Sequence, residues 1–109
     1  MNFRVEATPN FLSESKRLSK KYSSLKTDIA QLAESLASNP TMGTALGGGV
    51  YKIRLAIQSK GKGKSGGARV ITCVKIVRSV VYLVSIYDKS VRETISVNEI
   101  RDLIKKLPL

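Results

Sequence analysis

Apolar residues occur in two different patterns in the segments that we predict to be strands. Residues 2–8 and 50–58 alternate apolar with polar or charged side chains, the period of a half-buried strand. Residues 68–77 and 80–87 are apolar almost throughout, which is typical of central strands covered on both faces. Four strands are therefore predicted, and the last three follow one another as antiparallel neighbours.

Helical spacing of apolar residues appears between the first and second strands and again at the end of the chain. A Thr-Pro-Asn start signal at residues 8–10 opens a first helix, which we expect to run to about Tyr22. The spacing resumes at Leu25 and ends before Pro40, because proline cannot continue a helix. A short final helix is predicted within residues 96–107. The basic residues of the first two helices are interpreted as a solvated outer face.

The length and composition limit the number of domains and the kinds of catalytic or metal site that the chain can form. A chain of 109 residues with 42% hydrophobic content is expected to form one domain, residues 1–109, without help from metal or disulfide. The chain has no His, which excludes a Ser-His-Asp triad and most zinc sites, and its scattered carboxylates argue against a two-metal nuclease. We expect no metal and no cofactor. Cys73 lies in an apolar run and is interpreted as a buried residue rather than a redox or metal ligand.

No signal peptide and no apolar stretch of about 20 residues is found in the sequence. A cytoplasmic location without a membrane partner is therefore expected.

Positive charge is concentrated in the middle of the chain. Residues 50–78 contain no Asp or Glu, and they supply eight cations to a net charge of +11. These cations are Lys52, Arg54, Lys60, Lys62, Lys64, Arg69, Lys75 and Arg78. Such a surface attracts polyanions and favours phosphate contacts through counterion release. The pattern predicts nucleic acid as the partner.

Residues 59–67 form a glycine-lysine loop that invites two interpretations. A Walker loop is excluded, since Gly67 stands where that motif needs Lys and a strand follows in place of a helix. The loop is either a flexible connection made soluble by its lysines or a segment that embraces a nucleic-acid backbone. Nearby cations on strands, held rigidly at positions 52, 54 and 69, favour the second interpretation.

The chemistry open to such a site is cleavage of RNA by its own 2′-hydroxyl. This reaction needs a base for the 2′ proton, cations for the charge on the phosphorane oxygens, and an acid for the departing 5′ oxygen. Clustered cations favour the neutral amine of a lysine, so a lysine can act as the base without histidine.

Several segments of the sequence together resemble the RelE/ParE superfamily of bacterial toxins, most closely its HigB-type branch. They are Asn39-Pro40 and residues 51–55, 61–71, 82–83 and 86–89. The similarity spans nearly the whole chain, and its middle part is the most specific. It implies an α+β fold, with a small twisted antiparallel sheet of about four strands, the helical hairpin on one face, a basic cleft on the other and a short C-terminal helix.

The resemblance also implies the function. The chain would be the toxin component of a type II toxin-antitoxin system and a metal-independent, ribosome-dependent endoribonuclease, or mRNA interferase, that inhibits translation. Its partners would be a cognate antitoxin, the ribosome and mRNA, with DNA contacted only indirectly through the antitoxin.

The resemblance assigns roles by motif position. Lys52 is the candidate base, and Arg54 and Arg69 are the candidate phosphate clamps. Ser90 and Ser96 stand where nuclease members of one branch carry an arginine and a tyrosine. We therefore expect Lys89 to supply the general acid, ahead of Tyr87 and Arg92. The predicted RNA-binding residues are Lys60, Lys62, Lys64, Lys75, Tyr87 and Arg92.

Two alternative functions and the role of two tyrosines stay open. A ParE-type protein would bind DNA gyrase and cut nothing, and a non-catalytic module would bind RNA or the ribosome and leave transcripts whole. For Tyr82 and Tyr87, packing in the core is as good an explanation as base stacking.

Overall fold

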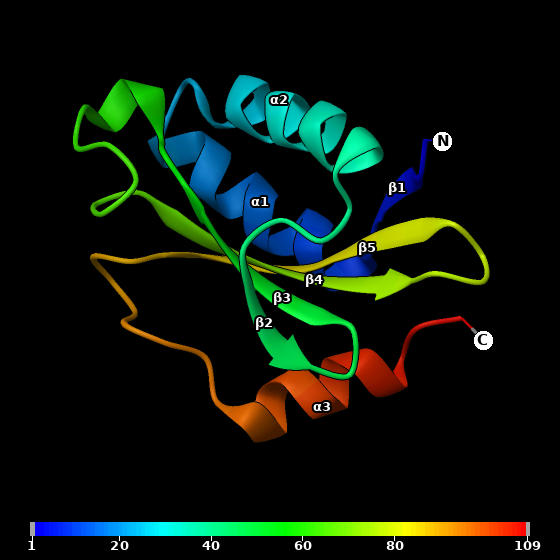
Figure 1. Cartoon of the computed structure of the whole chain (residues 1–109). Helices are drawn as coiled ribbons and strands as arrows, with labels where there is room; N and C mark the ends of the chain where they lie inside the picture. Colours follow the sequence, from blue (N-terminus) through cyan, green and yellow to red (C-terminus); the bar gives the residue numbers. More distant parts are fainter. Residues whose placement is uncertain (1, 109) are drawn as a thin grey trace.

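Three helices and five strands make up the fold in the computed structural model, which describes residues 2–108 (Figure 1). In chain order they are β1 (Arg4–Ala7), α1 (Pro9–Lys21), α2 (Leu25–Ser38), β2 (Thr44–Gly47), β3 (Val50–Leu55), the 3-10 turn η1 (Gln58–Lys60), β4 (Ala68–Lys75), β5 (Val80–Asp88) and α3 (Val97–Lys105). None of the helices within residues 2–108 has the length and apolar character needed to cross a membrane.

The strands form one sheet in the order β1-β5-β4-β3-β2. The predicted α+β fold with an N-terminal helical hairpin and a short C-terminal helix is confirmed, but two details of the sheet were wrong. The sheet has five strands rather than about four, and β1 pairs with β5 in parallel. The alternation in residues 2–8 indicates a strand without indicating its partner or direction.

The extra strand is β2, which lies in a glycine-rich segment, residues 41–49, where no strand was predicted. All four of its residues are exposed, and it pairs only with β3, at the edge of the sheet. Because neither face of β2 is buried, its sequence shows no alternation of apolar and polar side chains.

Each face of the sheet is covered by different helices (Figure 1). Phe11, Leu25 and Leu36 from α1 and α2 pack with Val70 and Leu83 on one face. On the other face, α3 packs against a second cluster, which contains Val50, Ile71, Cys73, Val80 and Tyr82. As predicted, the two central strands β4 and β5 are therefore buried on both faces, and Cys73 is buried among them.

The starts of α1 and α3 follow from their capping residues. The Thr8 hydroxyl accepts from the Phe11 amide at 3.2 Å, and Pro9 occupies the first turn, where its missing N–H costs nothing. The Ser96 hydroxyl accepts from the Glu99 amide at 3.1 Å in the same way. Both helix starts agree with the sequence prediction.

A β-bulge in β5 decides which face Tyr87 occupies. The register with β4 moves from Ile71↔Ser85 to Thr72↔Leu83, which leaves Val84 as the extra residue. Val84 and Tyr87 consequently belong to the same cluster beneath α3, although they are three positions apart. The bulge places Tyr87 on the α3 face of the sheet, directly opposite Arg69.

Candidate active site

Two arginines stand directly opposite each other on neighbouring strands. In the antiparallel register Arg54 of β3 pairs with Arg69 of β4, and Arg69 pairs in turn with Tyr87 of β5. Lys52 lies two residues before Arg54, so the two side chains leave the same face of β3. Like charges directly opposite one another destabilise a sheet, and an anion bound between them would remove that penalty. The backbone therefore brings three of the predicted site residues together.

The side chains of these three residues take different directions. Lys52 lines a groove of about 760 Å³ against α3, together with Ile95 and Ile100. Arg54 is exposed, and with Lys64 it lines a cavity of about 190 Å³ beside α2. Arg69 is only 5% exposed. The sequence led us to expect these three side chains to converge in one basic cleft. The register brings their backbones together, but Lys52 lies toward α3, Arg54 lies toward α2 and Arg69 is buried, so their charged groups do not converge in this structure.

Arg69 is held by the glycine-lysine loop. Its Nη1 donates to the Lys64 carbonyl at 2.9 Å and to the Ala68 carbonyl at 3.1 Å, and its Nη2 donates to the Ser65 carbonyl at 3.4 Å. The guanidinium is thus satisfied by backbone oxygens of the tip of the loop, residues 61–66, and of the strand start. A phosphate that contacts Arg69 must replace at least part of this set.

Lys60 makes a buried ion pair at the base of the same loop. Its Nζ donates to Asp88 Oδ1 and to Ser90 Oγ, each at 2.9 Å, and the Tyr22 hydroxyl donates to Asp88 Oδ2 at 2.6 Å. Asp88 is only 3% exposed and the Lys60 side chain 11%. Lys60 was predicted to bind RNA, but in this structure its ammonium is committed to an internal partner.

The ion pair shifts the pKa of both groups. Burial by itself would raise the pKa of Asp88, but hydrogen bonds from Tyr22, Lys60 and Ser90 outweigh it and hold that pKa well below its usual range. The hydrogen bond to Asp88 raises the pKa of Lys60 against an opposing effect of desolvation. Both shifts favour the charged forms, so the pair is ionised at neutral pH.

A second polar cluster fixes η1 to the start of α2. Asp28 is buried, and its Oδ2 accepts from the Ser24 hydroxyl at 2.8 Å and from the Gln58 amide at 3.1 Å. The Ser59 amide donates to the Ser24 hydroxyl at 2.8 Å. The base of the loop, Gln58–Lys60, is therefore held from two sides.

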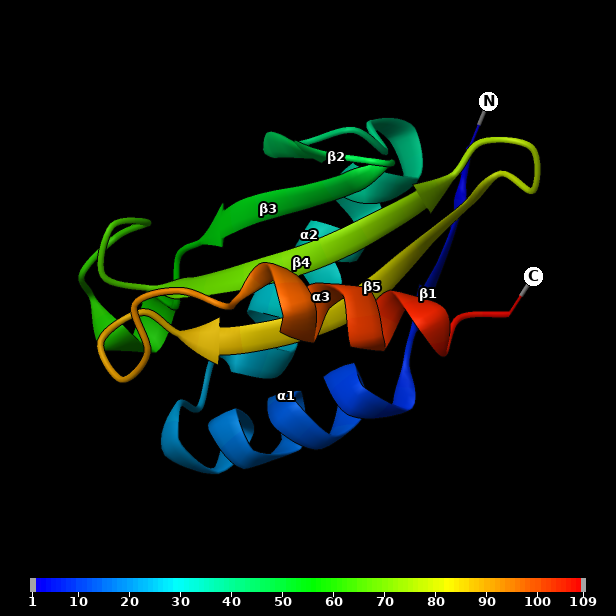
Figure 2. The same cartoon turned by 90° about the horizontal axis from the view of Figure 1, so that it is seen from below.

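Three other predicted RNA-binding lysines occupy different surroundings. Lys62 and Lys64 are exposed in the tip of the loop. Lys75 ends β4, six residues beyond Arg69, which corresponds to about 20 Å along an extended strand. Figure 2 shows the loop and the β4–β5 turn at opposite ends of the sheet. The structure therefore groups Lys62 and Lys64 with the two arginines and leaves Lys75 apart.

The residues after β5 pack over Tyr87. The Arg92 guanidinium lies 5.7 Å from the centre of the Tyr87 ring, donates to the Thr94 carbonyl at 2.9 Å and pairs with Glu99. The hydrogen bond between Arg92 and Glu99 raises the pKa of the first and lowers the pKa of the second. Tyr87 is 5% exposed, and within residues 2–108 its buried hydroxyl has no hydrogen-bond partner. In this structure Tyr87 is a core residue.

Lys89, the predicted general acid, lies next to the end of the loop. Its amide donates to the Gly67 carbonyl at 3.1 Å, and its half-buried side chain places Nζ 3.9 Å from Glu93 Oε1. Its role in catalysis stays a prediction.

Residues 10–107 match the family model described as the RelE toxin of the RelE / RelB toxin-antitoxin system. The chain belongs to the RelE toxin family. This assignment confirms the predicted RelE/ParE superfamily and makes the chain a toxin of a toxin-antitoxin system, with an antitoxin as partner. The HigB-type branch stays a prediction.

Two solved structures have the same fold as this RelE-family toxin. One is the free state of an E. coli RelE mutant with two Arg-to-Ala changes, which is 17% identical, has a TM-score of 0.67 and is matched over 99% of this chain and 100% of that one. The other is the isolated E. coli RelE toxin, 20% identical with a TM-score of 0.53, matched over 96% of this chain and 99% of that one. At this identity the likeness concerns the fold.

Sequence reasoning missed the acids that organise this end of the toxin. Asp28 was given no role, and Asp88 appeared only within residues 86–89 of the resemblance. The available signal at Asp88 was a carboxylate at the end of a strand predicted to be buried on both faces, where an unpaired charge would be costly.

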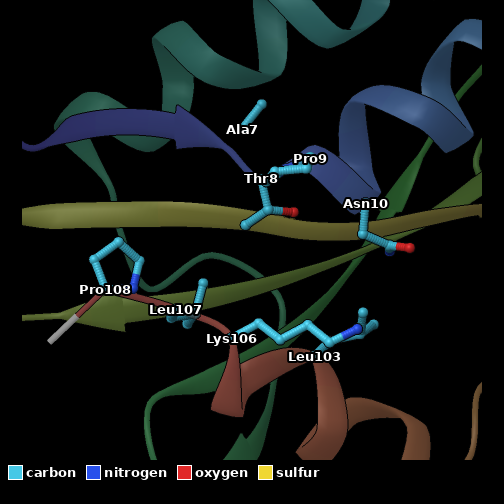
Figure 3. A pocket seen from close by; sticks show the side chains of 8 residues that line it. All are labelled: Ala7, Thr8, Pro9, Asn10, Leu103, Lys106, Leu107 and Pro108. Carbon is cyan, nitrogen blue, oxygen red and sulfur yellow. The ribbon is translucent and has the colours of Figure 1, made fainter.

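A further cavity lies away from these residues. It measures about 480 Å³ and lies between the start of α1 and the end of α3 (Figure 3). Lys106 is the charged residue among the eight that line it, and no predicted site residue is among them.

Proposed function

We propose that this RelE-family toxin is a ribosome-dependent endoribonuclease that cuts mRNA by attack of the 2′-hydroxyl on the adjacent phosphate. The observation that carries the proposal is the direct opposition of Arg54 and Arg69 on neighbouring strands, with Lys52 two residues away on the same face. Because arginines at directly opposed positions repel each other when their side chains turn the same way, an anion bound between them would remove that repulsion. The activity would be exerted in the cytoplasm, on message held by the ribosome.

The proposed roles follow from the chemistry of the side chains. Arginine stays charged and presents several donors, which suits Arg54 and Arg69 to the phosphorane oxygens. Lys52 would take the 2′ proton in its neutral form. Lys89 would protonate the departing 5′ oxygen. No metal enters these steps, because RNA supplies its own nucleophile.

The loop links substrate binding to the availability of Arg69. In the free toxin the Arg69 guanidinium donates to the carbonyls of Lys64, Ser65 and Ala68. We infer that a substrate phosphate replaces the loop carbonyls, and that Lys62 and Lys64 follow the RNA backbone as the loop tip moves. The fixed base at Gln58–Lys60 would keep this movement local.

The test is cleavage in a translating extract, with Arg69→Ala as the variant. Wild-type toxin should cut mRNA at ribosome-occupied codons, and Arg69→Ala should lower the rate by about 100-fold or more, the usual cost of losing a donor to a developing anion. The matched control is Arg78→Ala, which removes an exposed arginine in the β4–β5 turn and should cut at the wild-type rate.

Two results would contradict the proposal. Intact transcripts together with arrested DNA supercoiling would indicate a gyrase inhibitor of the ParE type. Intact transcripts on ribosomes that retain the toxin would indicate a binding module without catalysis.

A further inference from the structure

The sheet has an open edge beside Arg54. β2 pairs with β3 only at residues 50–52, so among residues 2–108 the rest of β3 has β4 as its single strand neighbour. The cavity of about 190 Å³ that Arg54 and Lys64 line lies at this edge, between β3, α2 and η1. An RNA strand held by Arg54 would therefore have the cavity beside it.

The apolar part of the cavity lining suits a flat ring. It consists of Leu32 from α2, Ile53 and Leu55 from β3, and Met42 from the segment between α2 and β2. Leu32 and Ile53 are core residues, so the packing around them fixes their positions, and a methionine sulfur makes favourable contacts with aromatic rings. The cavity is smaller than the range of about 300–1,000 Å³ that is typical of sites for drug-sized ligands. A single ring system is the appropriate size for its occupant.

The polar part of the lining offers hydrogen bonds that the protein itself does not use. Asp28 is only 3% exposed, and its Oδ2 accepts from Ser24 and from the Gln58 amide, but among residues 2–108 its Oδ1 has no hydrogen-bond partner. Within the same part of the chain the side-chain amides of Gln31 and Gln58 are also unengaged, and each provides donors and an acceptor. A buried carboxylate oxygen without a donor is unfavourable, so Asp28 Oδ1 marks a place for an N–H group of a ligand.

The distribution of charge selects the kind of ligand. A phosphate inside the cavity would face Asp28, whereas the exposed cations Arg54 and Lys64 favour a phosphate outside it. A cationic side chain of a protein partner could meet Asp28 but would be repelled by the same two cations. A nucleotide satisfies all three residues, because its nucleobase is uncharged, an amino group on the base can donate to the carboxylate, and its phosphate can meet the cations.

We propose that this cavity, with Asp28, Gln31 and Gln58 as its polar groups, binds the nucleobase next to the cut phosphate and prefers a base with an exocyclic amino group. Adenine, cytosine and guanine carry such a group, and uracil does not. The inference rests on the proposed RNA cleavage for the position of the phosphate. The preference among bases is a property of binding and can be measured without cleavage.

The experiment measures the affinity of the purified full-length toxin for four trinucleotides of 2′-O-methyl RNA, in which the nucleophile is blocked. Each has uracil on both sides of a middle adenine, cytosine, guanine or uracil. The all-uracil trinucleotide should bind about threefold or more weakly than the best of the other three, because it alone has no amino group for Asp28.

Replacement of the buried acid should remove the preference. Asp28→Asn keeps the size of the side chain and replaces one carboxylate oxygen with an amide group, so all four trinucleotides should bind within about twofold of one another. Asp102→Asn makes the same chemical change and the same change of net charge at an exposed position of α3 outside the cavity. It should retain the wild-type preference.

A second variant leaves the buried acid in place. Gln31→Ala removes one polar group at an exposed position of α2, where alanine favours the helix, and it should weaken binding of the preferred trinucleotide by about threefold. Thr27→Ala, at an exposed position of α2 that does not line the cavity, is the uncharged control and should bind as wild type does.

Each outcome decides the inference. Loss of the preference in Asp28→Asn alone, together with weaker binding by Gln31→Ala than by Thr27→Ala, supports it. Equal affinity of wild type for the four trinucleotides, an unchanged preference in Asp28→Asn, or equal affinities of Gln31→Ala and Thr27→Ala overturns it. Should Asp28→Asn fail to fold, the wild-type preference and the Gln31→Ala comparison decide.

Two further measurements separate this inference from its neighbours. Cavity variants that bind the antitoxin more weakly while keeping the base preference would assign the cavity to a protein partner, which also overturns the inference. A toxin that shows the expected preference among trinucleotides but cuts no message in the translating extract would contradict the proposed cleavage and leave the nucleobase site supported.

Discussion

The two ends of the glycine-lysine loop use the same residue type in opposite ways. At the base, Lys60 is nearly buried and paired with Asp88, and the backbone of Gln58 is fixed by Asp28. At the tip, Lys62 and Lys64 are exposed, and two backbone carbonyls of this part accept from Arg69. The comparison teaches that a lysine in a basic run is free to meet a ligand only where the fold leaves its ammonium unpaired.

The largest effect is expected from Asp88→Asn. Because this change leaves the Lys60 ammonium buried without a countercharge, it should lower the free energy of unfolding by about 3–5 kcal/mol, measured by urea denaturation at pH 7. Glu34→Gln, at an exposed position of α2, should change it by less than about 0.5 kcal/mol.

A double variant sharpens the same comparison. Lys60→Met combined with Asp88→Asn removes both charges and should recover part of the lost stability. If Asp88→Asn alone unfolds at the wild-type urea concentration, the base of the loop does not depend on this ion pair.

Arg54→Ala is expected to act on catalysis and not on stability. Arg54 is exposed, so its loss should change the free energy of unfolding by no more than about 0.5 kcal/mol, but it should lower the rate of mRNA cleavage by about 100-fold. Single-turnover cleavage on programmed ribosomes measures the rate, with Arg78→Ala as control. Wild-type cleavage by Arg54→Ala would remove this residue from the site.

Acid should weaken the base of the loop in the wild type. The pKa of Asp88 is lowered in the folded toxin, so its contribution to stability is complete above the unfolded value of about 3.9 and declines as the pH falls toward the folded value. Urea midpoints measured between pH 5 and pH 2 should therefore fall more steeply for wild type than for Asp88→Asn. Parallel curves would show that Asp88 titrates alike in both states.

The smallest effects are expected at the tip of the loop. Lys62→Ala and Lys64→Ala should each lower affinity for the ribosome by about threefold and should reduce the dependence of that affinity on salt. Ribosome binding at several salt concentrations checks both quantities. Unchanged affinity and an unchanged salt slope would mean that the loop lysines only increase solubility.

Much of the fold could be predicted from the sequence because its signals are local. The alternation in residues 50–58, the apolar runs of β4 and β5 and the capping residues Thr8 and Ser96 each depend on neighbours in the chain. The parallel pairing of β1 depends on a partner more than 70 residues away, and β2 buries neither of its faces, so no alternation of apolar and polar side chains marks it.

The candidate site was predictable only in part, because several of its contacts join residues that are far apart in the chain. The sequence placed Arg54 and Arg69 on neighbouring strands, but the twelve residues between Leu55 and Ala68 leave the register open, so only the structure shows their direct opposition. The ion pair of Lys60 with Asp88 joins residues 28 positions apart, and the turn of Tyr87 toward α3 requires a bulge at Val84. Neither feature changes the local pattern, so the sequence assigned Lys60 to RNA and left Tyr87 between RNA binding and the core.

The most direct test of the proposed chemistry replaces one atom of the message. Ribosomes would be programmed with an mRNA that carries a single 2′-deoxynucleotide at the position cut by wild-type toxin, beside the all-ribose mRNA as control. If the RNA supplies the nucleophile, the all-ribose message is cut to a 2′,3′-cyclic phosphate and the deoxy message stays whole at that position. Equal cleavage of both messages would contradict the account.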